Sequence, residues 1–225
     1  MVDCLESASG SLDIPSTYND LPVTSIGDAA FRDCTSLTYV TIPASVTSIG
    51  AIVFEGCSSL DSITIPDGVT NIGYMAFYNC TSLSSVVIPD GVTLIEGLAF
   101  AVCTNLTNII IPDSVIRLGY RAFGRCTSLE NITIPASVTT IDGRAFHYCT
   151  SLNSVVFEGN APTLGTEVFE GIQATKILVK EAYATSYGGE GATYGGLLVA
   201  PFSLSLYNSL VAERDAALAA KTTAE

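Results

Sequence analysis

Hydrophobic side chains recur along the chain with a period of 23 residues. Seven phenylalanines follow this spacing, at positions 31, 54, 77, 100, 123, 146 and 169. Six cysteines do the same at positions 34, 57, 80, 103, 126 and 149, and Ile-Pro pairs recur at 42–43, 65–66, 88–89, 111–112 and 134–135. A unit of this length is too short to bury its own apolar face, so neighbouring units must stack around a shared core. The period therefore predicts a solenoid.

Each unit contains a short segment in which apolar and polar residues alternate, as Val40, Thr41 and Ile42 do. A period of two is typical of a β-strand. Strands of successive units lie parallel and about 4.8 Å apart in a solenoid. The pattern predicts about eight short strands, centred near residues 12–14, 40–42, 63–65, 86–88, 109–111, 132–134, 155–157 and 177–179.

The rest of each unit is predicted to turn, return and form a short helix. Pro-Asp-Gly at 66–68 and 89–91 is a turn sequence. Ala30, Phe31 and Cys34 have roughly helical spacing, which predicts one or two helical turns on the far side of the sheet. The predicted fold class is therefore α/β.

Departures from the period divide the chain into four segments. Residues 1–27 are predicted to form an N-terminal capping repeat, 28–180 the solenoid, 181–200 a C-terminal cap loop, and 201–225 a helical or flexible tail. In the tail, Leu204, Tyr207, Val211 and Leu218 are spaced as in a heptad stripe. Copies of the chain could associate through this tail, and a disordered tail is the alternative.

The composition narrows the possible functions. Of 225 residues, 48% are hydrophobic and 14% charged, and the net charge is −13. The excess of acidic residues argues against binding to nucleic acid, because the phosphate backbone is itself negatively charged. The high hydrophobic fraction argues against a disordered chain. The longest uncharged stretch, 191–212, contains Pro201 and several polar residues, which argues against a membrane span. The first residues lack the basic and apolar regions of an export signal, so a cytoplasmic location stays open.

No residue pattern predicts catalysis, a cofactor or a metal. Cysteines stacked 23 residues apart are expected to be free, buried thiols, and Cys4, outside this column, is the one candidate for pairing between chains. The column formed by Asp67, Asp90 and Asp113 fits turn chemistry, with a hard cation as the alternative. His147, the only histidine, occupies a variable position and completes no catalytic triad. The chain is therefore predicted not to be an enzyme.

The consensus C-T-S-L-x-x-V-x-I-P-x-S-V-T-x-I-G-x-x-A-F resembles the BspA-like leucine-rich repeat over roughly residues 10–180. The opening segment, residues 10–27, is similar to the usual first repeat of that family. The resemblance implies a leucine-rich-repeat solenoid. Because known members are mostly surface or secreted proteins proposed to bind host or matrix components, it also implies an extracellular or surface-exposed location and a protein or glycan partner.

Two surfaces remain as candidates for binding such a partner. One is a stripe of residues not required by the core, and its tyrosines and arginines are enriched at binding hot spots. Its predicted members are Tyr74, Tyr78, Arg117, Tyr120, Arg121, Arg125, Arg144, His147 and Tyr148. The other is the outer face of the sheet, where Val87 and Ile110 are apolar; β-propensity alone is the alternative explanation there.

These observations favour a non-catalytic protein-binding or adhesion module that presents a rigid repeat surface to a macromolecular partner. The alternative is a structural subunit of a multi-copy assembly or particle surface, such as a virion or cell-surface decoration protein, attached through its tail or an end cap.

Overall fold

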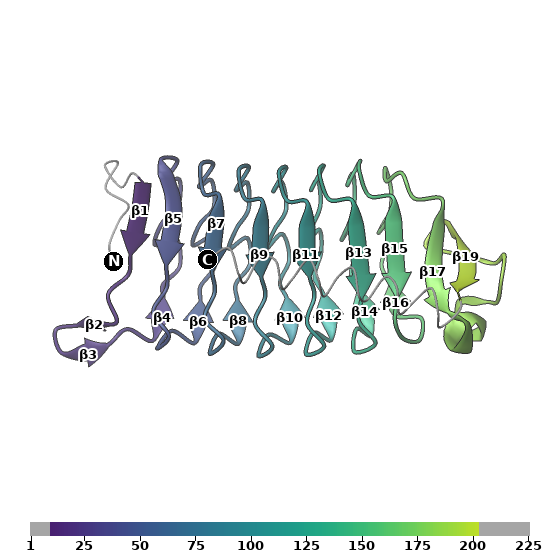
Figure 1. Ribbon diagram of the computed structural model, residues 1–225, viewed down its shortest axis with the longest axis horizontal. Helices are drawn as coiled ribbons and strands as arrows, with labels where there is room; N and C mark the ends of the chain where they lie inside the picture. The colour runs from purple at the N-terminus through teal and green to yellow at the C-terminus, as the bar shows by residue number, and fades with distance from the viewer. Residues whose placement is uncertain (1–9, 203–225) are drawn as a thin grey trace.

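The computed structural model describes residues 10–202, which form a parallel-strand β-solenoid of about eight coils (Figure 1). Each coil contributes one strand to a front sheet, as predicted. The front strands are β1 (Gly10–Asp13), β5 (Leu37–Thr41), β7 (Ser62–Thr64), β9 (Ser85–Val87), β11 (Asn108–Ile110), β13 (Asn131–Ile134), β15 (Ser154–Phe157), β17 (Lys176–Lys180) and β19 (Leu197–Phe202). Neighbouring strands are parallel and mostly offset by 23 residues, so equivalent side chains lie side by side.

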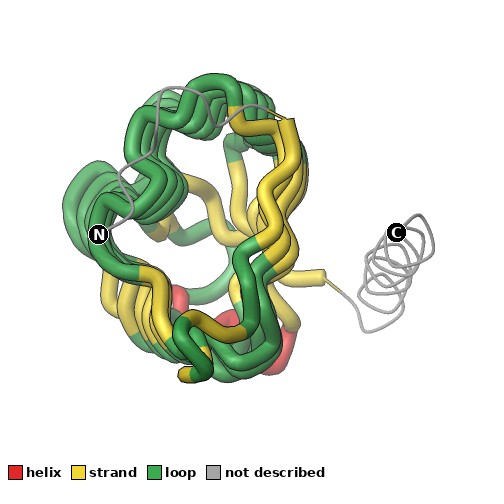
Figure 2. The backbone as a smooth tube through the Cα atoms, turned by 90° about the vertical axis from the view of Figure 1, so that its left-hand side faces the viewer, coloured by secondary structure: helices red, strands yellow, loops and turns green. Residues whose placement is uncertain are grey.

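A second parallel sheet runs along another side of the solenoid, as the view along its axis shows (Figure 2). Its strands are only two residues long, and each places one apolar residue inward. They are β4 (Ser25–Ile26), β6 (Ser48–Ile49), β8 (Asn71–Ile72), β10 (Leu94–Ile95), β12 (Arg117–Leu118), β14 (Thr140–Ile141) and β16 (Thr163–Leu164). The sequence pattern indicated the inward residues of this segment but not the strands.

The core is built from columns of identical side chains. The seven phenylalanines of the period stack with ring centroids 5.2–5.7 Å apart and nearly parallel planes. Beside them lie five free, buried thiols: Cys57, Cys80, Cys103, Cys126 and Cys149. Cys34, the first cysteine of the column, is disulfide-bonded, so the prediction of a free thiol was wrong at that position. Each thiol donates a hydrogen bond to the carbonyl of a phenylalanine in the preceding coil, at 3.0–3.2 Å. The cysteine is thus small enough for the column and also satisfies a buried acceptor.

The predicted helical turns are replaced by consecutive β-turns. In the segment 27–34, every second N–H bonds three residues back, as Arg32 does to Ala29. The N–H groups between them donate to the next coil, as Phe31 does to the carbonyl of Val53. An α-helix would direct all these N–H groups along its own axis and leave none for the neighbouring coil. The turns instead add a third line of hydrogen bonds between coils.

These turns place residues in the left-handed backbone region, which favours glycine. Two positions of each turn segment are affected, and most carry a side chain. Among them are the β-branched residues Ile52 (φ 51°) and Val102 (φ 63°), whereas Gly56 (φ 73°) occupies the position equivalent to Val102. The coil geometry therefore imposes local strain at Ile52 and Val102.

The two ends of the described chain depart from the repeat. At the first coil, β2 (Thr17–Tyr18) and β3 (Leu21–Pro22) form an antiparallel hairpin in place of the expected loop. Asn19 and Asp20 have positive φ, as a two-residue hairpin turn requires. Tyr18 and Leu21 beside this turn are 71% and 69% exposed. The hairpin projects from the solenoid at the lower left of Figure 1.

At the other end, residues 181–200 are not a loop. They contain a 3-10 helix, η1 (Glu181–Tyr187), the strand β18 (Thr193–Tyr194) and most of β19, which extends the front sheet by pairing in parallel with β17. Tyr187 and Tyr194 pack against Phe157, and the Tyr187 hydroxyl donates to the carbonyl of Gly159 at 2.9 Å. Burial raises the pKa of both hydroxyls. Beyond Phe202, the tail predicted over 201–225 lies outside the described residues, as does Cys4.

Candidate binding surfaces

The outer face of the front sheet carries residues that the core does not use. Strand alternation places them as predicted: Tyr39, Thr41, Ser62, Thr64, Ser85, Val87, Asn108, Ile110, Asn131, Thr133, Ser154 and Val156. Val87 is 51% exposed and Ile110 is half-buried, whereas Val156 is only 6% exposed. The face is therefore polar and small over most of its length, with apolar residues in its middle coils.

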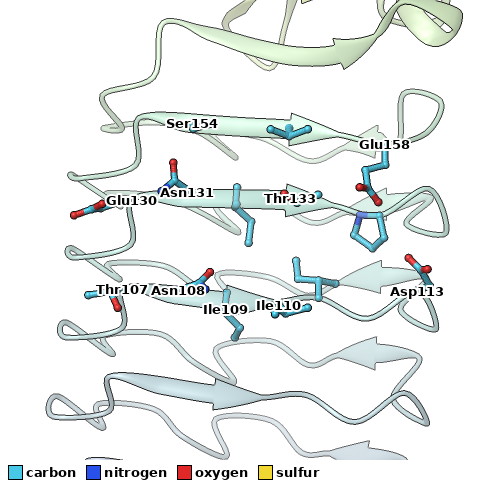
Figure 3. A pocket seen from close by; sticks show the side chains of 14 residues that line it. Thr107, Asn108, Ile109, Ile110, Asp113, Glu130, Asn131, Thr133, Ser154 and Glu158 are labelled. Carbon is cyan, nitrogen blue, oxygen red and sulfur yellow. The ribbon is translucent and has the colours of Figure 1, made fainter. Parts of the chain in front are cut away.

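A hollow of about 400 Å³ lies in this face, over β11, β13 and β15 (Figure 3). It coincides with a break in the front sheet: within residues 10–202, β11 and β13 belong to separate hydrogen-bonded sheets although they lie side by side. Its volume falls within the range of small-ligand pockets, about 300–1,000 Å³. Nothing in the sequence period indicates where this break occurs.

The lining of the hollow combines three kinds of side chain. Asn108, Asn131, Thr107, Thr133 and Ser154 are neutral and polar, and Ile110, Val156 and Pro135 are apolar. Three carboxylates, Asp113, Glu130 and Glu158, complete it together with Ile109, Ile111 and Ile132. The lining includes no histidine, lysine, arginine or cysteine. These groups can hydrogen-bond a ligand and attract positive charge.

The predicted stripe of tyrosines and arginines lies elsewhere, mostly on the turn segments. Tyr74, Tyr120 and Tyr148 are exposed there, and the Arg121 guanidinium lies 5.4 Å from the centre of the Tyr120 ring. Tyr78 is half-buried, and Arg125 is exposed. Val87 and Ile110 belong to the front sheet, so the predicted site residues fall on two surfaces of the molecule.

Basic side chains of the stripe form pairs between coils. Arg144 pairs with Glu167 and also donates to the Tyr120 hydroxyl at 3.4 Å. Arg117, on β12, pairs with Asp142 through a shortest distance of 2.8 Å. The Arg144 guanidinium lowers the pKa of the Glu167 carboxyl by hydrogen bonding. Much of the positive charge in this stripe is thus already neutralised within the protein.

One cluster could supply metal ligands, although the sequence predicted no metal. Ligand atoms of His147, Glu167 and Glu170 lie within 4.8 Å of one another, and His147 Nε2 is 3.3 Å from a Glu170 oxygen. Arg144 forms an ion pair with Glu167 and would compete with a metal cation for this carboxylate. The period could have revealed this cluster, since His147 and Glu170 are 23 residues apart and therefore adjacent in neighbouring coils.

The stacked parallel strands and the buried leucine, isoleucine and phenylalanine columns define a leucine-rich-repeat solenoid. The chain belongs to the family described as the BspA type leucine-rich repeat region, whose model matches residues 10–128 and 70–187. The resemblance drawn from the consensus is thereby confirmed. No curated protein matches the chain.

Several solved structures are similar to this chain. A leucine-rich repeat protein of T. pallidum is 27% identical, with a TM-score of 0.50, over 84% of this chain and 88% of that protein. A leucine-rich cell surface protein of Faecalibacterium prausnitzii is 25% identical, with a TM-score of 0.54, over 86% of this chain and 69% of that protein. The pneumococcal vaccine antigen PcpA is 19% identical, with a TM-score of 0.50, over 87% of this chain and 63% of that protein, and this likeness concerns the fold alone.

Leucine-rich-repeat solenoids are generally not enzymes and typically bind proteins or lie at a surface. Over residues 10–202, no helix has the length and apolar character needed to cross a bilayer.

Proposed function

We propose that this protein is a non-catalytic binding module that presents the outer face of its front sheet to a macromolecular partner. The observation that carries the proposal is the hollow over β11, β13 and β15, which lies in a face that contributes little to the core. A rigid solenoid holds such a face in place without the entropic cost of ordering loops on binding.

The sheet face is favoured over the stripe of tyrosines and arginines. On the stripe, Arg144, His147 and Arg117 are engaged with acidic residues of the next coil, so a partner would have to compete for them. The polar residues of the hollow are arranged around an open space. A surface location fits this function and is supported by the likeness to the cell surface protein of F. prausnitzii.

Binding to a panel of purified cell-surface proteins, matrix proteins and glycans, measured by biolayer interferometry, tests the proposal. Thr133→Trp fills the hollow with a large side chain, while Thr139→Trp places the same side chain at an exposed position of the same coil off the front sheet. A triple change of Arg121, Arg125 and Arg144 to Ala probes the stripe.

We expect at least one panel member to bind at micromolar concentration, and Thr133→Trp to weaken that binding at least tenfold. The Thr139→Trp variant and the triple variant should bind like the wild type. Binding that is lost in the triple variant and unaffected by Thr133→Trp would move the site to the stripe, and no binding by any panel member would contradict the proposed function.

A further inference from the structure

We propose that the hollow takes an extended, basic segment of a partner polypeptide. This inference rests on the proposed function, because it names the partner of the same sheet face. The inference starts from the charge of the hollow, which is lined by three carboxylates and by no basic side chain. The whole chain has a net charge of −13. A surface of one sign attracts and orients a partner segment of the opposite sign.

The carboxylates lie at the two ends of the hollow. Figure 3 shows Glu130 where β13 begins, and Asp113 and Glu158 beyond the ends of β11 and β15. In the 23-residue register Asp113 is aligned with position 136, six residues from Glu130. Six fully extended residues span about 20 Å, which is an upper limit for this separation because β13 ends at Ile134 and the chain then turns. An extended segment with basic side chains six positions apart is therefore long enough to reach both ends.

Between its ends the hollow offers groups suited to a peptide rather than to a single cation. The amides of Asn108 and Asn131 each provide donors and an acceptor, the groups that peptide bonds require. Ile110 and Val156 form an apolar middle. Side chains at positions i+2 and i+4 of an extended segment point the same way as those at i and i+6, so apolar residues there would meet this middle.

The charged residues next to the hollow indicate which of its three carboxylates bind the positive charge of the partner segment. The register of β15 with β17 places Lys180 beside Glu158 and Lys176 beside Ser154, and Glu158 is only 8% exposed. Asp113 and Glu130 are exposed and lie in the coils of β11 and β13, Asp113 after β11 and Glu130 immediately before β13, whereas β17 pairs with β15. The proposal therefore assigns the recognition of positive charge to Asp113 and Glu130.

The repeat supplies a matched control for these two residues. Asp90 occupies the position equivalent to Asp113 one coil earlier, and Asp61 occupies the position equivalent to Glu130 three coils earlier. Neither lines the hollow, and both are exposed. The pair Asp113→Asn and Glu130→Gln and the pair Asp61→Asn and Asp90→Asn therefore remove the same charge from equivalent columns.

The probe is a fluorescently labelled peptide, Lys-Ser-Val-Ser-Val-Ser-Lys, titrated with the full chain and followed by anisotropy. We expect the double change at Asp113 and Glu130 to weaken binding about tenfold, and the double change at Asp61 and Asp90 to change it less than twofold. Replacing both lysines by glutamine should also weaken binding about tenfold, and replacing them by glutamate should abolish it. Unchanged urea midpoints of both protein variants show that folding is preserved.

Equal weakening by the two protein variants would reduce the effect to net charge and overturn the inference. So would peptide binding that fails while a chitosan tetramer binds in a manner sensitive to Thr133→Trp, since the occupant would then be an amino sugar. The proposed function is tested separately, because panel partners blocked by Thr133→Trp would uphold it even if the basic peptide does not bind.

Discussion

The interior columns of the solenoid hardly change from coil to coil, whereas the outer columns change freely. The position of Phe100 is phenylalanine in seven successive coils. Two residues earlier, at the position of Leu98, the same seven coils hold Ala, Ile, Met, Leu, Arg, Arg and Glu. An interior side chain must fit its own copies above and below, while an outer one faces solvent. Stability should therefore be concentrated in the interior columns and recognition in the outer ones.

The largest expected effect follows from shortening an interior side chain in the middle of the stack. Phe100 is fully buried, and its ring lies 5.2 Å from that of Phe77 and 5.7 Å from that of Phe123. We expect Phe100→Ala to lower the free energy of unfolding by about 3–5 kcal/mol, because it leaves a cavity between two stacked coils. Urea denaturation followed by circular dichroism measures the change.

Phe31→Ala is the matched control, since Phe31 is the first ring of the stack, is only half-buried and, within residues 10–202, stacks on Phe54 alone. Its cost should be clearly smaller, about half that of Phe100→Ala. Equal costs at the two positions would mean that the stack is not the source of the stability.

The buried thiols make the stability of the interior depend on pH in the alkaline range. Burial raises the pKa of Cys103 to about 12. The unfolded chain releases this proton near pH 9 and the folded chain does not. The stability contributed by the neutral thiol is therefore complete below pH 9 and falls by about 1.4 kcal/mol per pH unit between pH 9 and 12.

Cys103→Ser tests this dependence, because serine does not titrate and can still donate to the carbonyl of Phe77. Urea denaturation at pH 8, 9 and 10 should show an average slope reduced by about half a proton relative to the wild type, approaching one proton at pH 10. An unchanged slope would show that Cys103 does not contribute in this way.

A smaller effect of opposite sign is expected where the turns strain the backbone. Val102 is a β-branched residue at φ 63°, and Gly56 and Gly171 occupy the same position in other coils. The left-handed conformation costs an L-residue about 1–2 kcal/mol, and glycine loses about 0.5–1 kcal/mol in chain entropy. Val102→Gly should therefore raise the free energy of unfolding by about 0.5 kcal/mol.

Ala51→Gly is the control for this substitution, because Ala51 is not among the residues with positive φ. Glycine there brings only its entropic cost and should lower stability by about 0.5–1 kcal/mol. Calorimetric melting of the two variants should give shifts of opposite sign, and a shift of the same sign would argue against strain at Val102.

The comparison of interior and outer columns also explains how far the sequence predicts the structure. Eight strands of the front sheet were predicted because apolar and polar residues alternate within each strand, and this alternating segment recurs about every 23 residues. β19 was missed because Leu197–Phe202 lies after a segment that departs from the period. The β-turns were mistaken for helical turns because residues three apart, such as Phe31 and Cys34, lie close in both structures.

The candidate site was less predictable for a physical reason. Strand alternation places Asn108, Asn131 and Thr133 on the outer face, and the sequence shows this much. The hollow depends on a break in hydrogen bonding between β11 and β13, whose sequences differ little from those of their neighbours. The sequence period therefore carries no local signal that would place the break between these two strands.

The smallest effect is expected for the ion pair between Arg144 and Glu167 on the turn segments. The two side chains are 35% and 44% exposed, so water and salt screen the pair, and the long side chains lose entropy when they associate. Arg144 lowers the pKa of the Glu167 carboxyl, so the contribution of the pair is complete above the usual glutamate range and is lost as the pH falls through the lowered value. Glu167→Gln at pH 7 should shift the urea midpoint slightly in 20 mM NaCl and not measurably in 500 mM NaCl. A loss of stability close to that of Phe100→Ala, persisting in high salt, would show that this outer column holds the coils together and would remove the distinction between the two kinds of column.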